Sequence, residues 1–171
     1  ILAVVKRKST APCLKLCSAQ KVVAANVGSP ASRVVLSDAA SALDWLQTIN
    51  PNAKFCWISG FSFGAWIAMQ VLMRRPEIYS FIAVAPPANM FDFTFLAPCP
   101  SSGLIIHGAR DDLVPESDVA TLAQKLQNQR HIEIDYRVIK GANHLFEDKI
   151  DMLAKYIEAY LDENMAIAEA G

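Results

Sequence analysis

The sequence predicts a protein of the α/β class, in which helices cover both faces of a mostly parallel sheet. Three apolar runs of strand length alternate with stretches whose apolar residues recur at helical spacing. Because these runs are continuously apolar, we expect strands that are buried on both faces. Helical connections between such strands favour parallel pairing. The length of 171 residues suits one domain with one sizeable core.

The elements become readable from residue 37 onward. Ser37 or Asp38 is expected to cap a helix that ends at Asn50-Pro51. The predicted order after it is a strand (54–58), a helix (65–73), a strand (81–85), a loop (86–102), a strand (103–107), a helix capped by Ser117, a strand (132–139) and a last helix whose apolar stripe runs from Phe146 to Leu161. We expect one domain over residues 37–163 and a frayed tail over residues 164–171.

Residues 1–36 form an atypical N-terminal segment. Residues 1–37 hold six basic side chains and no acidic one, whereas the rest of the chain holds all 17 acidic side chains. Val22–Ala25 and Val34–Leu36 are candidates for short strands, and Gly28-Ser29-Pro30 marks a turn. Such a Lys/Ser-rich segment fits a targeting peptide, and it also fits a shifted reading frame or a misplaced start.

The totals exclude several functional classes. A formal net charge of −1 implies no general attraction to nucleic acid or to an anionic membrane. No apolar run approaches the roughly 18 residues that span a bilayer, and Ile1–Val5 is too short for the core of a signal peptide. Neither a P-loop nor a dinucleotide-binding glycine pattern is present. We therefore expect a cytoplasmic protein without a cofactor.

The cysteines give no indication of a metal site. They lie at positions 13, 17, 56 and 99, a spacing without a C-x-x-C pair or a Cys/His cluster. Cys56 lies in the middle of a predicted strand and is expected to be a small buried hydrophobe. We predict reduced thiols and no bound metal.

A serine between two glycines lies where a predicted strand turns into a predicted helix. Gly60, Ser62 and Gly64 form the pattern G-x-S-x-G, which is typical of the nucleophile elbow of serine hydrolases. The turn is so tight that the positions two before and two after the serine have no room for a large side chain. We expect it to lift the Ser62 hydroxyl off the end of the sheet. The Phe63 backbone N–H, at the start of the helix, is predicted to face the oxyanion of acyl transfer.

Two downstream residues are candidates to activate that serine, because a serine hydroxyl hardly ionises and needs a base. His144, in the Gly/Asn-rich loop 141–144, is the predicted base, and Asp111 is the predicted acid that orients it. All three residues follow strand ends, which meet at one edge of a parallel sheet. The chain order Ser62, Asp111, His144 is one of the known orders of such a triad.

Other aspartates and histidines are alternative candidates for the roles of acid and base. Asp112 is better explained as a turn or cap residue, and Asp92, after the preceding strand, is a second candidate for the acid. His107 is expected to be a structural hydrogen-bonding residue under the acid loop, with catalysis as the alternative. His131 is expected to be solvated.

From about Leu36 to about Glu163 the chain resembles the C-terminal two-thirds of an α/β-hydrolase. It is similar to the compact, cap-less bacterial hydrolases of the dienelactone hydrolase and serine aminopeptidase type. The stretches that carry the resemblance are 37–45, 60–65, 107–115 (as H-G-x-x-D-x-x-V-P) and 141–144. The resemblance implies an α/β-hydrolase fold with Asp111 as the acid and His144 as the base, but it implies no substrate.

The resemblance also implies elements that residues 1–36 do not match. Relatives have upstream strands, a helix and a loop that supplies a second N–H to the oxyanion. No such loop is recognisable here, and the segment is too short for all these elements. We therefore expect a fold without the usual N-terminal strands and a truncated or frame-shifted N-terminus.

The predicted function is that of a serine hydrolase of small, ester-like substrates. A peptidase of the same fold is one alternative, and a non-catalytic or inactive truncated hydrolase-like protein is the other. The expected partner is a small-molecule substrate, with a homo-oligomer as a possibility. A loop too short for a cap domain carries Met90, Phe91, Phe93 and Phe95. These four side chains could line an acyl pocket, or they could belong to the core or to a self-association surface.

Overall fold

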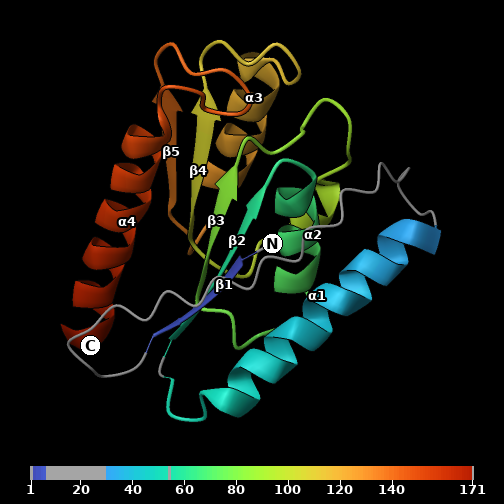
Figure 1. The fold of residues 1–171 in the computed structure, drawn as a ribbon, viewed down its shortest axis with the longest axis vertical. Coiled ribbons are helices and arrows are strands. Elements are labelled where there is room, and N and C mark those ends of the chain that lie inside the picture. The colour runs from blue at the N-terminus through green and yellow to red at the C-terminus, as the bar shows by residue number, and fades with distance from the viewer. Residues whose placement is uncertain (1, 7–29, 54, 171) are drawn as a thin grey trace.

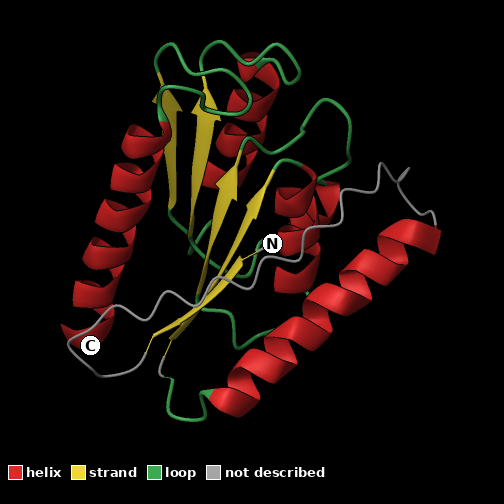
Figure 2. Ribbon diagram, viewed as in Figure 1, coloured by secondary structure: helices red, strands yellow, loops and turns green. Residues whose placement is uncertain are grey.

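The computed structural model describes residues 2–6, 30–53 and 55–170. A central sheet stands between helices on both of its faces (Figures 1 and 2). The elements in chain order are β1 (Leu2–Lys6), α1 (Pro30–Ile49), β2 (Phe55–Phe61), α2 (Phe63–Leu72), β3 (Ser80–Val84), the short 3-10 helix η1 (Thr94–Leu96), β4 (Gly103–Gly108), α3 (Glu116–Gln127), β5 (Ile134–Ile139) and α4 (Ile150–Ala170).

The sheet has the strand order β1-β2-β3-β4-β5. Strands β2 to β5 are parallel, as predicted, and their carboxyl ends lie at one edge of the sheet. β1 pairs antiparallel with β2, with Leu2 opposite Ser59, and this strand was not predicted. It covers the edge of β2 that faces away from β3.

Each face of the sheet has its own apolar core, because successive strand residues point to opposite faces. On β2, Cys56 and Ile58 pack with residues of α1, α2 and α3. Trp57, between them, packs on the other face with Tyr160 and Leu161 of α4. This alternation explains why the strands are continuously apolar, and it confirms the prediction of helices on both faces.

The first helix differs from its prediction. α1 begins at Pro30, so neither Ser37 nor Asp38 caps it, and Val34–Leu36 is helical where a short strand was expected. Proline is favoured in the first turn of a helix, where its missing N–H costs nothing. The side chains of Val35 and Leu36 pack against the core. The other candidate strand, Val22–Ala25, lies outside the described residues.

Helices α3 and α4 also differ from their predictions at their ends. α3 begins at Glu116, with Pro115 rather than Ser117 at the N-cap position. Phe146 is buried in the loop before α4, and α4 continues to Ala170 where a frayed tail was expected over residues 164–171. Within the described ranges, none of the helices combines the length and apolarity needed to cross a membrane.

Candidate active site

Ser62 lies in a strained turn between β2 and α2. Its φ of 50° and ψ of −123° are unusual for a residue with a side chain. A Cβ atom on Gly60 would overlap the carbonyl group of Gly64, so the close approach of these two residues requires glycine at position 60. The Ser62 N–H donates to the Val84 carbonyl oxygen at 2.8 Å, which ties the turn to the end of β3.

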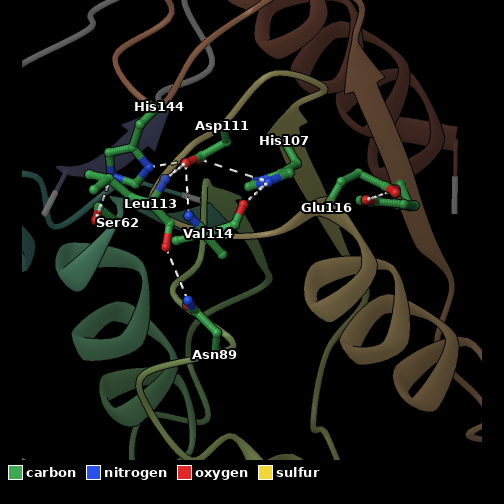
Figure 3. Close-up of polar contacts among 9 residues, drawn as sticks. Ser62, Asn89, His107, Asp111, Leu113, Val114, Glu116 and His144 are labelled. Atoms are coloured by element: carbon green, nitrogen blue, oxygen red, sulfur yellow. Dashed lines mark hydrogen bonds and ion pairs between the residues drawn. The ribbon is translucent and has the colours of Figure 1, made fainter.

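Three residues from distant parts of the chain form one hydrogen-bonded row (Figure 3). The Ser62 Oγ lies 3.0 Å from Nε2 of His144. The other ring nitrogen of His144, Nδ1, lies 2.7 Å from Oδ2 of Asp111. The structure thus brings together the three side chains that the sequence singled out, at the distances expected for a nucleophile, a base and an orienting acid.

Asp111 is held as a carboxylate. Burial by itself raises the pKa of its carboxyl group, but hydrogen bonds to the charged form outweigh burial and hold the pKa below its usual value. Oδ1 accepts the backbone N–H groups of Leu113 and Val114, both at 2.9 Å. Oδ2 remains available for His144, so the turn presents one oxygen to the imidazole. An ionised acid there stabilises a proton on the base.

His107 lies directly beneath this turn, as predicted. Its side chain is fully buried, and Nε2 lies 3.0 Å from the Val114 carbonyl oxygen and 3.8 Å from Oδ2 of Asp111. A carbonyl oxygen can only accept, so Nε2 carries the proton. Nδ1 is buried, and none of the described residues forms a hydrogen bond with it. Burial lowers the pKa of His107, which is consistent with a neutral ring that supports the acid turn.

Gly108 allows the acid turn and the histidine loop to meet, a role that its position in the motif alone did not reveal. A Cβ atom there would lie 2.6 Å from the Ala142 carbonyl oxygen. That same oxygen accepts the Arg110 N–H at 2.8 Å. Ala142 lies two residues before His144, so this hydrogen bond joins the acid turn to the histidine loop. The sequence shows only that a glycine follows His107. The backbone oxygen for which Gly108 makes room belongs to a loop over 30 residues further along the chain.

Three further contacts hold the site and were not predicted. The Asn89 side-chain amide donates to the Leu113 carbonyl oxygen at 3.0 Å, which joins the loop after β3 to the acid turn (Figure 3). The Phe61 ring lies 5.2 Å from the ring of His144, measured between centroids. In the histidine loop, Asn143 exchanges two hydrogen bonds with Glu147. These partners are far apart in sequence or lack a motif, so only the fold identifies them.

The remaining candidates lie elsewhere. The carboxylate of Asp92 is exposed and accepts both the N–H and the hydroxyl of Thr94, which lowers its pKa, so it serves a turn rather than His144. Asp112 and His131 are exposed. Among the residues that the structure describes, no group of three His, Cys, Asp or Glu side chains could hold a metal ion.

The aromatic loop after β3 divides between core and surface. Phe93 is buried in the core under α1 to α3, and Phe95 packs against it. The Phe91 ring contacts the rings of Phe63 and Trp66, with centroids 5.5 Å and 5.1 Å away. Met90 is exposed. Phe93 is therefore a core residue, whereas Phe91 packs on the start of α2 and Met90 lies at the surface.

The fold is that of an α/β-hydrolase, and comparison with known proteins identifies the family. The family model of the dienelactone hydrolase family matches residues 17–167. The chain belongs to that family.

Similar proteins come from several bacteria. An uncharacterized protein of Rickettsia prowazekii is 54% identical over 128 residues, which are 72% of this chain and 54% of that protein. A crystal structure of a protein of unknown function from Agrobacterium tumefaciens, provisionally named an alpha/beta hydrolase, is 52% identical with a TM-score of 0.76. That match covers 86% of this chain and 65% of that one, so the chain spans between half and two thirds of the length of these relatives.

A second solved structure is also similar to this chain. It is an alpha-beta serine hydrolase homologue from Coxiella burnetii, 25% identical with a TM-score of 0.64. The match covers 83% of this chain and 65% of that one. These likenesses agree with the parallel sheet and the helices of both faces.

Proposed function

We propose that this chain is a serine hydrolase that cleaves small carboxylic esters, with Ser62 as nucleophile, His144 as base and Asp111 as orienting acid. The observation that carries the proposal is the hydrogen-bonded row from Ser62 Oγ through His144 to Asp111, with distances of 3.0 Å and 2.7 Å. The family to which the chain belongs and the serine hydrolase homologue among similar structures support the same reaction class.

The reaction follows from the roles of these atoms. The Ser62 Oγ attacks the ester carbonyl carbon while its proton passes to Nε2 of His144. Asp111 stabilises the imidazolium, which then protonates the leaving alcohol. Water then attacks the acyl-enzyme with His144 again as base, and the carboxylic acid product is released from Ser62. His144 serves both half-reactions without changing its bond to Asp111.

The negative charge that develops on the carbonyl oxygen needs hydrogen-bond donors. Phe63 is the first residue of α2, so its N–H has no partner four residues back within the helix. The helix dipole adds to the attraction of an anion at this end. We assign the Phe63 N–H as one oxyanion donor. Removing one such donor in other enzymes costs about 10²–10³ in rate.

A fluorophosphonate probe tests the proposal, because it reacts with activated serines. We expect the wild-type chain to be labelled at one site, and labelling to disappear in Ser62→Ala. His144→Ala and Asp111→Asn should each slow labelling by about 10³-fold or more. Ser41→Ala, an exposed serine on α1, is the matched control and should be labelled like the wild type.

The outcome separates the proposal from its alternatives. No label on a chain that circular dichroism shows to be folded would support the non-catalytic, hydrolase-like alternative and contradict ours. A labelled chain that cleaves peptide anilides faster than the matching nitrophenyl esters would favour a peptidase of the same fold.

A further inference from the structure

Four large apolar side chains in the segments that build the site are exposed, although burial would stabilise them. Phe61, Met90, Leu113 and Leu145 have exposed fractions of 42%, 54%, 61% and 58%. We call these four residues the apolar rim. A soluble surface rarely gathers such side chains in one place without a binding role.

The rim residues come from all four segments that build the site. Phe61 directly precedes Ser62, and its ring contacts the ring of His144. Leu145 directly follows His144. The Leu113 N–H donates to Asp111, and its carbonyl oxygen accepts from Asn89, the neighbour of Met90 (Figure 3). The four residues therefore adjoin the site along the chain, and Phe61 and Leu113 also contact His144 and Asp111 directly.

The aromatic ring that follows Met90 in the chain packs at the start of α2. Phe91 follows Met90 and packs on Phe63 and Trp66 at the start of α2. Phe63 and Phe91 are half-buried, so each keeps part of its ring at the surface. This group of aromatic rings begins at Phe63, which directly follows Ser62 and whose backbone N–H is the predicted oxyanion donor.

The charges beside the rim do not favour a charged substrate. Arg110 and Asp112 are both exposed, have opposite signs and flank Asp111 in the acid turn. Glu147 is engaged with Asn143 in the histidine loop. A carboxylate or a cation on the substrate would thus find no matching cluster among these groups, whereas a hydrocarbon chain would find apolar partners in all four segments.

From this arrangement we infer that the site takes esters with an apolar alkyl or acyl chain, which lies over the apolar rim during the reaction. The inference rests on the proposed function and adds the substrate class. We favour a substrate over a second copy of the chain as occupant, because Phe61 and Leu145 adjoin Ser62 and His144 in the chain and Leu113 bonds to Asp111. A protein seated there would block the nucleophile.

A series of p-nitrophenyl alkylphosphonates tests the inference without requiring turnover. The Ser62 oxygen forms a bond to phosphorus, the bond from phosphorus to p-nitrophenolate breaks, and the serine proton passes to His144. One equivalent of p-nitrophenolate is released, and its rate is measured for methyl, butyl and hexyl phosphonates. Complete burial of a methylene would raise the rate by up to about fourfold, so we expect a hexyl-to-methyl ratio of at least roughly tenfold.

Substitutions in the apolar rim test whether these residues cause the dependence of the rate on chain length. Met90→Ser and Leu113→Ser should each lower the hexyl-to-methyl ratio by roughly two- to fivefold, since each removes apolar contact area. Both side chains are exposed, so neither change endangers the fold. Trp45→Ser is the matched control, because Trp45 is exposed to 55% on α1 near the start of β2, at the opposite end of that strand from Ser62. It should leave the ratio unchanged.

The results test the apolar substrate class separately from the proposed hydrolase function. A burst of p-nitrophenolate whose rate does not depend on chain length would overturn the rim inference and leave the proposed function standing. Rim variants that keep the ratio but convert a dimer to a monomer in sedimentation would also overturn it, in favour of self-association. The absence of a burst with every phosphonate, from folded chain, would contradict the proposed function itself.

Discussion

His107 shows how a buried side chain can support the site without touching the substrate. Its Nε2–H is committed to the Val114 carbonyl, and Val114 in turn donates its N–H to Asp111. Protonation would place a hydrogen on the buried Nδ1, which has no hydrogen-bond partner in the part of the chain that the structure describes. Burial therefore lowers the pKa, although Asp111 and Glu116 attract the proton. The ring stays neutral where a solvated histidine begins to charge.

The lowered pKa of His107 predicts a pH dependence of stability. Below the ordinary value of 6.5 the unfolded chain binds a proton that the folded chain does not, so stability is complete above pH 6.5 and falls as the pH is lowered. The slope cannot exceed about 1.4 kcal/mol per pH unit. Urea unfolding between pH 7.5 and 5.5 should show this slope in the wild type and not in His107→Gln.

Two comparisons make that experiment specific. Glutamine at position 107 can still donate to the Val114 carbonyl, so the change removes the titration and keeps the hydrogen bond. His131→Gln alters an exposed histidine and should retain the wild-type slope. Asp111 contributes only at lower pH, because its stabilisation is lost as the pH falls through a value below 3.8. An unchanged slope in His107→Gln would show that His107 does not titrate as argued.

At the scale of the elements, the site is a meeting of turns that leave the carboxyl ends of the strands. The turn after β4 is bound to the histidine loop through Arg110 and Ala142, and to the loop after β3 through Leu113 and Asn89. Each bond fixes one turn against another. The spacing of the catalytic candidates therefore depends on how closely the backbone segments approach.

Gly108→Ala tests that approach. The added methyl would lie 2.6 Å from a backbone oxygen of Ala142, so one of the two turns must move. We expect a loss of stability of about 1–3 kcal/mol and slower fluorophosphonate labelling of Ser62. Gly141→Asn is the control, because space around Gly141 is open and asparagine tolerates its φ of 78°. Normal labelling and stability in Gly108→Ala would refute the role given to this glycine.

At the scale of the whole molecule, the sheet separates two apolar cores. Ile67 belongs to the core under α1 to α3, and Ile106 to the core under α4. The two clusters share no residue, and the strands between them are held by hydrogen bonds rather than by side chains. Small changes on one face should thus not be felt on the other.

The measurable consequence is that substitutions in the two cores should have additive effects on the free energy of unfolding. Ile67→Val and Ile106→Val each remove one buried methylene and should each cost about 0.5–1.5 kcal/mol. The double variant should cost the sum within about 0.5 kcal/mol in the free energy of unfolding, since neither site shares a partner with the other. A coupling energy well above that limit would mean that the sheet transmits packing strain between its faces.

Much of this protein could be predicted from sequence because its signals are local. The apolar runs identify β2 to β5, and glycines around a serine identify a turn whose geometry requires them. Helix ends were less predictable. Pro30 starts α1 and Pro115 precedes α3, while the serines and the aspartate that looked like caps lie inside these helices. Several capping residues in a row offer alternatives, and packing selects among them.

Sequence alone therefore determined the class of fold, the order of β2 to β5 along the chain and the three side chains that the fold was expected to unite. Only the tertiary structure decided how they are held: the carbonyl of Val114 over His107, the amide of Asn89 on the acid turn and the ring of Phe61 against His144. It also decided that Phe93 is core and that Met90 is surface. The physical reason is that strand and turn propensities act between neighbours, whereas burial and these contacts join segments that only the folded sheet brings together.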